Sequence, residues 1–307
     1  MSVAFLFPGQ GAQQVGMLHQ LPAHPTVAST LKEASVVLGQ DVSLLDNEQA
    51  LHSTVSVQLA LLIAGVATAR ALTAEGARPA MVAGLSVGAF SAAVIAGSLD
   101  FPPALRLVHL RGVLMERAYP RGYGMGVIVG LTEAEVNRLL KPIHTSATPV
   151  FLANLNAPRQ IVIAGTEQAV QKALEQTLHA GAHKAERLPV QVPSHCPLME
   201  PVTERLEQEI QSVSLAPPSV LYISSSSARA LSAPEVIGKD LARNVAQLVR
   251  WYDATTALFE LGTRLFVELP PGRVLTDLAT EAFPKARAIA LSSSSLNSVS
   301  TLIQRER

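Results

Sequence analysis

The segment Gly84-Leu85-Ser86-Val87-Gly88 constrains the fold of this chain more than any other feature of its sequence. A strand-like apolar run, Ala80 to Leu85, leads into it, and Val87 to Ala96 continues with helical spacing. Glycines two positions either side of a serine let a strand and a helix cross without a Cβ clash. The segment therefore predicts a sharp turn from a buried strand into a helix, with the serine on the turn.

Strand-like and helical segments alternate along most of the chain, which is typical of α/β proteins. The expected strands include Val3 to Phe7, which ends at the turn Pro8 to Gly11, and Leu265 to Leu269. The expected helices include Val55 to Leu72 and Leu105 to Ala118. With the serine turn, these segments predict a large α/β-hydrolase-like domain built on a parallel sheet.

The spacing changes after Pro120-Arg121-Gly122. Between residues 123 and 192 short segments follow in the order β-α-β-β-α-β, the order of a ferredoxin-like unit. The expected strands and helices are, in chain order, Met125 to Val129, Glu133 to Leu140, Val150 to Asn154, Gln160 to Ala164, Glu167 to His179 and Leu188 to Val192. We therefore expect residues 123–192 to form an inserted ferredoxin-like α+β subdomain, and residues 1–122 and 193–307 to form the larger catalytic domain.

The charge balance disfavours two classes of partner. The 307 residues carry 24 basic and 24 acidic side chains, so nothing in the composition attracts a nucleic acid or an anionic membrane surface. The longest apolar stretch, Leu59 to Ala67, is well short of the roughly 20 residues that span a bilayer. It is expected to be part of a buried helix.

Cys196 is the only cysteine, which leaves no basis for an internal disulfide or a thiolate zinc site. No metal is expected. The apolar run at the N-terminus has no basic leader and stops at Pro8-Gly9, which is too short for a signal peptide. These features predict a soluble, cytoplasmic protein.

Ser86 is a candidate nucleophile, because a serine on such a turn projects above the sheet at the positive end of a helix. Backbone N–H groups at that end can stabilise an oxyanion. The alternative is a structural turn whose serine only caps the helix.

A serine nucleophile needs a base. Of the eight histidines, His195 is favoured, because the segment Val192 to Pro197 joins a strand to a helix. Cys196 paired with His195 is disfavoured, since adjacent side chains point apart.

Several separated segments together resemble malonyl-CoA:acyl carrier protein transacylases over nearly the whole chain. They are Phe7-Pro8-Gly9-Gln10-Gly11, the turn at Ser86, Arg111-Gly112, Asn154-Leu155-Asn156, Gln160 to Gly165, Val192-Pro193-Ser194-His195-Cys196, Asn244 seven residues before Trp251, and Glu268 to Thr276.

The resemblance implies a role for each matched residue. Ser86 is the acylated nucleophile, and His195 is the general base that later acts as the acid. Asn244 orients the histidine in place of a triad carboxylate. The backbone amides of Gln10 and Val87 form the oxyanion hole.

Arg111 matches the residue that binds the free carboxylate of the malonyl group, and a guanidinium can bind that group bidentately. From the residue alone, a solvated arginine on a helix surface is the commoner case. The implied substrates are malonyl-CoA and the thiol prosthetic group of an acyl carrier protein, with no permanently bound cofactor.

Within this family three segments most resemble the transacylase (epsilon) subunit of malonate decarboxylase. They are Gly84 to Phe90, Tyr119 to Met125 and Phe151 to Asn156. The fatty-acid branch usually has histidine before the serine and glutamate after the second glycine, where this chain has Leu85 and Ala89. This implies the carrier subunit of malonate decarboxylase as the acceptor.

Three alternatives remain open at this point. The same chemistry could serve fatty-acid or polyketide synthesis. A serine esterase or thioesterase would share the turn but would not need Arg111. An inactive scaffold subunit would not become acylated at Ser86.

Overall fold

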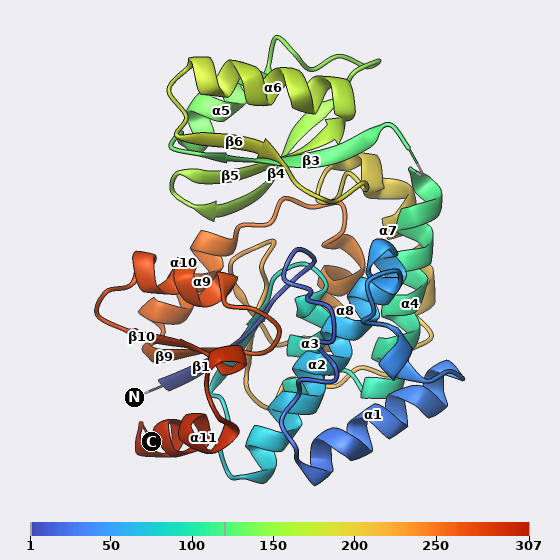
Figure 1. The fold of residues 1–307 in the computed structure, drawn as a ribbon, viewed down its shortest axis with the longest axis vertical. Coiled ribbons are helices and arrows are strands. Elements are labelled where there is room, and N and C mark those ends of the chain that lie inside the picture. The colour runs from blue at the N-terminus through green and yellow to red at the C-terminus, as the bar shows by residue number, and fades with distance from the viewer. Residues whose placement is uncertain (1, 120, 307) are drawn as a thin grey trace.

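Two β-sheets organise the chain, a six-stranded sheet and a smaller four-stranded one (Figure 1). The structure, a computed structural model, describes residues 2–119 and 121–306. Met1, Arg307 and Pro120, which belongs to the segment Pro120-Arg121-Gly122 noted above, lie outside the described residues. The α/β class and the parallel sheet expected from the sequence are confirmed.

The large sheet has the strand order β10-β9-β1-β2-β7-β8. All neighbouring strands pair in parallel except β7 and β8, which are antiparallel. The strands are β1 (Ser2–Phe7), β2 (Met81–Gly84), β7 (Leu221–Ile223), β8 (Ala230–Leu231), β9 (Thr263–Glu268) and β10 (Arg287–Ala290). The central strand β1 is buried from Val3 to Phe7, as an unbroken apolar run in a parallel sheet predicts.

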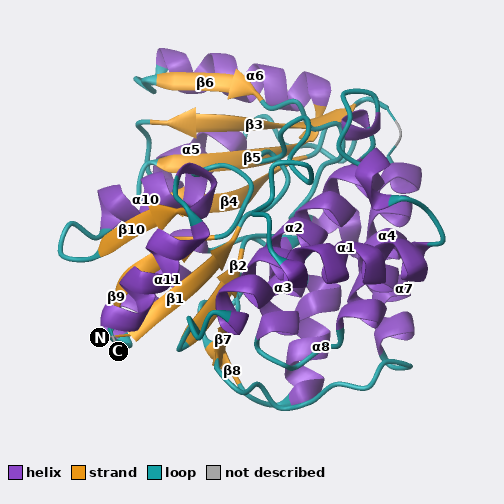
Figure 2. Cartoon of the chain, turned by 60° about the horizontal axis from the view of Figure 1, so that its bottom comes forward, coloured by secondary structure: helices purple, strands orange, loops and turns teal. Residues whose placement is uncertain are grey.

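Helices cover both faces of this sheet. They are α1 (Pro25–Leu38), α2 (Thr54–Ala74), α3 (Gly88–Ile95), α4 (Phe101–Ala118), α7 (Glu200–Ile210), α8 (Pro234–Arg243), α9 (Trp251–Glu260), α10 (Val274–Ala282) and α11 (Leu296–Arg305). Short 3₁₀ turns lie at Val42–Leu44, Ala50–His52, Pro197–Met199 and Leu291–Ser293. Figure 2 shows α1 to α4 gathered with α7 and α8 on one side of the strands.

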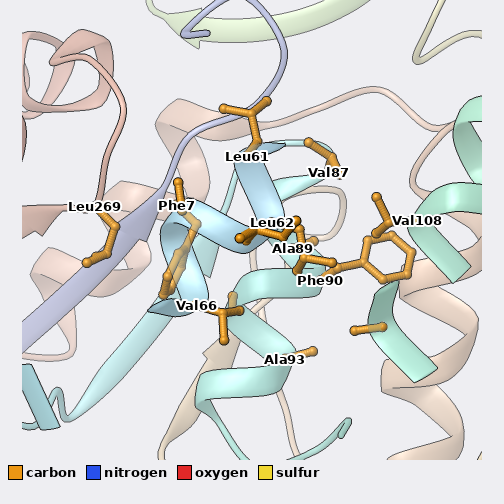
Figure 3. Packing of buried hydrophobic residues seen from close by; sticks show 14 of the residues in the cluster. Phe7, Leu61, Leu62, Val66, Val87, Ala89, Phe90, Ala93, Val108 and Leu269 are labelled. Atoms are coloured by element: carbon orange, nitrogen blue, oxygen red, sulfur yellow. The ribbon is translucent and has the colours of Figure 1, made fainter. Parts of the chain in front are cut away.

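Alternate residues of β1 enter different cores. Phe5 and Phe7 pack with α2, α3 and α4, whereas Ala4 and Leu6 pack with α9 and α10. This is the expected result of the two-residue side-chain period of a strand. Figure 3 shows Phe7 beside α2 and α3 residues such as Val66 and Phe90 in the first core.

Helix α2 lies in the core beside the large sheet and is buried along most of its length, as the apolar run at 59–67 predicts. By length and composition it is the one helix among the described residues that could span a membrane. However, 83% of its most apolar window is buried inside the protein. The apolar character of α2 is therefore explained by its burial in the core.

The small sheet has the strand order β4-β5-β3-β6, and all its pairings are antiparallel. Its elements are β3 (Tyr123–Val129), α5 (Glu133–Leu140), β4 (Val150–Ala157), β5 (Gln160–Thr166), α6 (Glu167–His179) and β6 (Lys184–Arg187). Helices α5 and α6 pack on one face of this sheet, and the other face turns toward the large sheet (Figure 1). The two helices have the bounds expected from the sequence.

The last strand of the small sheet is not where the sequence analysis expected it. The apolar run Leu188 to Val192 was the predicted strand, but β6 is the charged segment Lys184–Arg187, paired with β3. That prediction was wrong because β6 is an edge strand, and edge strands commonly carry charges on their exposed side chains. Residues 188–192 instead lead back toward the large sheet.

The edge strand β4 is hydrogen-bonded to the loop between α8 and α9. The Leu155 N–H donates to the Val249 carbonyl at 2.7 Å, and the Val249 N–H donates to the Ala153 carbonyl at 2.9 Å. Val249 follows α8 by a few residues, so the small sheet is tied to the segment at the end of that helix.

Candidate active site

The turn that carries Ser86 has the geometry predicted from its glycines. Strand β2 ends at Gly84, helix α3 begins at Gly88, and Ser86 between them has a φ of 56°. A Cβ on Gly84 would collide with the backbone of Gly88, and one on Gly88 would collide with the Phe7 carbonyl. Only glycine fits at these two positions, which holds the serine on a left-handed, strained turn.

His195 lies next to Ser86, although 109 residues separate them in the chain. The distance from Ser86 Oγ to His195 Nε2 is 2.8 Å. Both side chains are buried, with Ser86 7% and His195 3% exposed. His195 also has a left-handed backbone, with a φ of 63°, and its N–H donates to the Val245 carbonyl at 2.7 Å. No residue pattern around position 195 indicates this second strained backbone.

Asn244 contacts His195 through its backbone instead of its side chain. His195 Nδ1 lies 2.7 Å from the Asn244 carbonyl oxygen. Asn244 is the C-cap of α8, where the last carbonyls have no partner within the helix. Its side-chain Nδ2 donates to the Ser86 carbonyl at 3.4 Å. Asn244, the residue expected to orient the ring, therefore contacts it with its backbone carbonyl, because a carbonyl at a helix end is already a free acceptor.

The hydrogen bonds define the protonation of the ring. A carbonyl can only accept, so Nδ1 carries the proton and Nε2 is left to accept from the Ser86 hydroxyl. Burial, with a smaller contribution from the nearby Arg111 charge, lowers the His195 pKa from 6.5 to about 4. The ring is therefore neutral near pH 7 and able to take up the serine proton.

Arg111 is fully buried, 0% exposed, so it is not a solvated arginine on a helix surface. From α4 its Nη2 donates to Ser86 Oγ at 3.2 Å and to Asn244 Oδ1 at 3.4 Å. Its Nη1 donates to Gln58 Oε1 at 2.7 Å. Burial lowers the pKa of the guanidinium to about 9, which still leaves it charged at neutral pH.

Gln58 is a site residue that the sequence analysis missed. It lies on α2, is 1% exposed, and contacts Arg111 directly. The available signal was a lone glutamine just before the apolar run Leu59 to Ala67. A polar side chain inside a helix that is buried all round needs a specific partner.

A cavity of about 380 Å³ joins these residues between the two sheets. We call the residues Gln58, Ser86, Arg111 and His195, all from the large-sheet part, the cavity floor. The cavity roof comes from the small-sheet part of the chain, with the apolar residues Met125, Val127, Val129, Val162, Leu188 and Val190 and the polar residues Asn154, Asn156, Gln160, Lys184 and Glu186. The floor supplies a hydroxyl, a base and a cation within one enclosure, which suits acyl transfer involving an anionic acyl group.

Gln10 and Val87 flank Ser86 from two directions. Gln10 lines the cavity on the loop after β1, and Val87 caps the N-terminus of α3. Gly9, beside Gln10, lies so close to Leu85 that an added Cβ would be 2.7 Å from its carbonyl oxygen. The backbone N–H groups of Gln10 and Val87 have no hydrogen-bond acceptor within residues 2–119 and 121–306. Free donors of this kind are what an oxyanion hole requires.

Cys196 follows His195 but does not take part in the site. Its Sγ donates to the Pro193 carbonyl at 3.1 Å, and burial raises its pKa to about 12. The thiol is therefore protonated, and a protonated thiol is a poor nucleophile. This agrees with the preference for Ser86 over Cys196.

Comparison with known proteins gives a consistent picture. A family described as "Acyl transferase domain" matches residues 4–305. The malonyl CoA-acyl carrier protein transacylase of Escherichia coli is 38% identical over 294 residues, covering 94% of this chain and 95% of that protein.

Solved structures are similar over almost the whole chain. The malonyl CoA-acyl carrier protein transacylase of Coxiella burnetii has a TM-score of 0.94 and 37% identity, covering 99% of this chain and 98% of that one. A malonyl-transacylase solved in complex with a type II PKS acyl-carrier protein has a TM-score of 0.93 and 36% identity, covering 99% of this chain and 100% of that one.

Proposed function

This chain belongs to the acyl transferase domain family of acyltransferases, and from that premise we propose that it is a malonyl-CoA:acyl carrier protein transacylase. The observation that carries the proposal is the cavity floor, where the Ser86 hydroxyl lies 2.8 Å from His195 Nε2 and 3.2 Å from Arg111 Nη2. The similar proteins named as malonyl transacylases support the same reaction.

In the first half-reaction Ser86 Oγ attacks the thioester carbonyl of malonyl-CoA. Its proton passes to His195 Nε2, and the backbone N–H groups of Gln10 and Val87 stabilise the oxyanion. The tetrahedral intermediate collapses, the C–S bond breaks, and His195 returns the proton to the departing thiolate. The products are free coenzyme A and a malonyl ester of Ser86.

In the second half-reaction the carrier thiol gives its proton to His195 and attacks the ester carbonyl. The C–O bond breaks, and His195 protonates Ser86 Oγ, so the enzyme is regenerated. Division into two transfers predicts ping-pong kinetics. The carbonyl of Asn244 orients the ring without a negative charge, so it stabilises the imidazolium less than a buried carboxylate would.

Arg111 would select malonyl over acetyl groups. A malonyl thioester carries a carboxylate that an acetyl thioester lacks, and a buried guanidinium binds it strongly. Removing one partner of such a fully desolvated charge pair typically costs about 2–5 kcal/mol of binding free energy. That is enough to discriminate between the two acyl groups.

The carrier partner is proposed to be an acyl carrier protein of fatty-acid or polyketide synthesis, since the compared proteins carry transacylase names. This favours the alternative over the malonate decarboxylase carrier first inferred from sequence. Leu85 and Ala89 still favour the decarboxylase subunit as a second candidate. Ala89 is 1% exposed in the core, so the usual glutamate would be desolvated here.

Several further features belong to the same proposal. Residues 1–122 and 193–307 form an α/β-hydrolase-like catalytic domain, and the ferredoxin-like insert 123–192 covers its site. Side chains carry both half-reactions, so no permanently bound cofactor is needed. Coenzyme A thioesters as substrates, with Cys196 as a free thiol, favour a cytoplasmic location.

Intact-mass analysis after mixing with malonyl-CoA tests the proposal. We expect the protein to gain one malonyl group, which a fatty-acid acyl carrier protein with its thiol arm then removes. Removal only by the malonate decarboxylase carrier would support the second candidate. Release of free malonate faster than transfer to any carrier would identify a thioesterase, and absence of acylation would contradict the proposal altogether.

A further inference from the structure

Within the residues that the structure describes, every hydrogen-bond partner of the buried Arg111 guanidinium is neutral. These partners are Gln58 Oε1 at 2.7 Å, Ser86 Oγ at 3.2 Å and Asn244 Oδ1 at 3.4 Å. None of the ion pairs within residues 2–119 and 121–306 includes Arg111. Its Nε–H is also buried and has no acceptor in the described part of the chain. A buried cation without an anion is costly, so this arrangement needs an explanation.

Helices α2 and α4 approach closely at the point where Gln58 meets Arg111. A Cβ on Gly112 would lie 2.7 Å from Val55 Cα, so the residue after the arginine has to be small. One turn further along α4, Glu116 Oε1 accepts from the Ser53 hydroxyl at 2.8 Å and from the Val55 N–H at 3.2 Å. These contacts hold the start of α2 against α4 and set the position of Gln58.

The Gln58 amide has one orientation. Its Nε2 donates to Met115 Sδ at 3.2 Å, and its Oε1 accepts from Arg111 Nη1 at 2.7 Å. A guanidinium only donates and a thioether only accepts, so a flipped amide would lose both contacts. Met115 lies four residues after Arg111, on the same face of α4. The glutamine is thus a fixed, neutral acceptor.

We propose that Gln58 is a positioning residue for acyl-group specificity: it holds the Arg111 guanidinium in place through an uncharged oxygen and so leaves its positive charge for the substrate carboxylate. The inference rests on the proposed malonyl transfer. A glutamate of similar size could accept the same hydrogen bond, but it would neutralise the guanidinium within the protein. A malonyl carboxylate would then be the second anion beside a single cation, whereas an acetyl group would be unaffected by that repulsion.

The charge-preserving role differs from a merely structural one in a measurable way. A structural role for Gln58 predicts that a substitution lowers malonyl and acetyl transfer by the same factor. The proposed role predicts that the ratio between the two changes, and that it changes far more when the new side chain carries a negative charge than when it is neutral.

The test compares Gln58→Glu with Gln58→Met in the full chain. Rates of transfer from malonyl-CoA and from acetyl-CoA to a carrier with its thiol arm are measured for both variants and the wild type. For Gln58→Glu we expect malonyl kcat/KM to fall about 100-fold, with a much smaller fall for acetyl, as expected when a desolvated charge pair is lost. For Gln58→Met we expect a higher KM for malonyl-CoA with the preference for malonyl retained.

An unchanged malonyl-to-acetyl ratio in Gln58→Glu, with a normal thermal unfolding midpoint, would overturn the inference. If that variant does not fold, Gln58→Met decides, because loss of its malonyl preference would show that neutrality is not what matters. Wild-type protein that fails to accept malonyl at Ser86 would refute the proposed function. Wild-type acylation with an unchanged ratio in the variant would refute only the role of Gln58.

Discussion

The cavity floor and the cavity roof differ in how their polar groups are satisfied. On the floor Ser86 is hydrogen-bonded to His195 at 2.8 Å and to Arg111 at 3.2 Å, and both Ser86 and His195 have a left-handed backbone. On the roof apolar and polar side chains are mixed, and the Oδ1 atoms of Asn154 and Asn156 are buried without a partner among the described residues. The floor is organised before substrate arrives, whereas the roof keeps acceptors free.

This difference suggests that the floor carries out the chemical step and that the roof binds the rest of the ligand. A preorganised floor lowers the barrier of the chemical step, because its donors and acceptors need not rearrange. Free acceptors between apolar side chains suit the amide N–H groups of a long thioester arm. A few such polar contacts can fix the orientation of a ligand in a pocket. Substitutions on the floor should therefore change the acyl transfer itself, and substitutions on the roof should change binding.

The largest effect is expected from Ser86→Ala. Without the hydroxyl no ester can form, so incorporation of malonyl from malonyl-CoA should disappear in intact-mass measurements. Ser98→Ala is a matched control, because the Ser98 hydroxyl is also buried but has no hydrogen-bond partner in the described part of the chain. Labelling that persists in Ser86→Ala would place the nucleophile elsewhere.

Arg111→Ala should come next. We expect malonyl kcat/KM to fall by about 100-fold or more, since a buried charge pair with the substrate is lost, while acetyl transfer falls less. Arg106→Ala, an exposed arginine on the same helix, should change neither rate. Steady-state rates with the two thioesters provide the measurement, and an unaltered preference for malonyl would contradict the assignment of Arg111.

The pH dependence of the floor follows from His195. Because burial lowers its pKa to about 4, the acid limb of Ser86 acylation should lie near pH 4, and the rate should change little between pH 5 and 7. Single-turnover acylation against pH would reveal this. An acid limb near pH 6.5 would mean that the ring is as basic as a solvated histidine.

The same shift affects stability. Between pH 6.5 and about 4 the unfolded chain binds a proton at position 195 that the folded protein does not. The free energy of unfolding should therefore decrease as the pH falls through this window, by up to about 3 kcal/mol from this group. Urea titrations of the wild type and of His195→Gln would isolate the contribution, which should be missing in the variant.

The smallest effect is expected on the roof. For Asn154→Ala we expect KM for malonyl-CoA to rise up to about tenfold with kcat nearly unchanged, as for the loss of a single hydrogen bond to the ligand. A malonyl thioester of a short thiol without amide groups should not distinguish the variant from the wild type. An equal loss with both thioesters would show that the roof contributes to the chemistry and would weaken the contrast with the floor.

Much of the fold could be predicted from local patterns. Helices α5 and α6 have the expected bounds because their apolar spacing and N-terminal caps are encoded within a few residues. The last strand of the insert was misplaced because its pairing with β3 outweighs the local apolar pattern at 188–192. A charged edge strand cannot be recognised without knowing which strand it joins.

The sequence by itself determined the turn at Ser86, because the glycines at 84 and 88 impose a backbone that no other residue allows. From their place in recognisable segments it also predicted His195 and Arg111 as neighbours of Ser86, and both lie within hydrogen-bond distance of its hydroxyl. Only the tertiary structure decided that a backbone carbonyl holds the histidine and that Gln58 holds the arginine. Those contacts join helices and loops that are distant in the chain, and their geometry depends on how closely the helices pack.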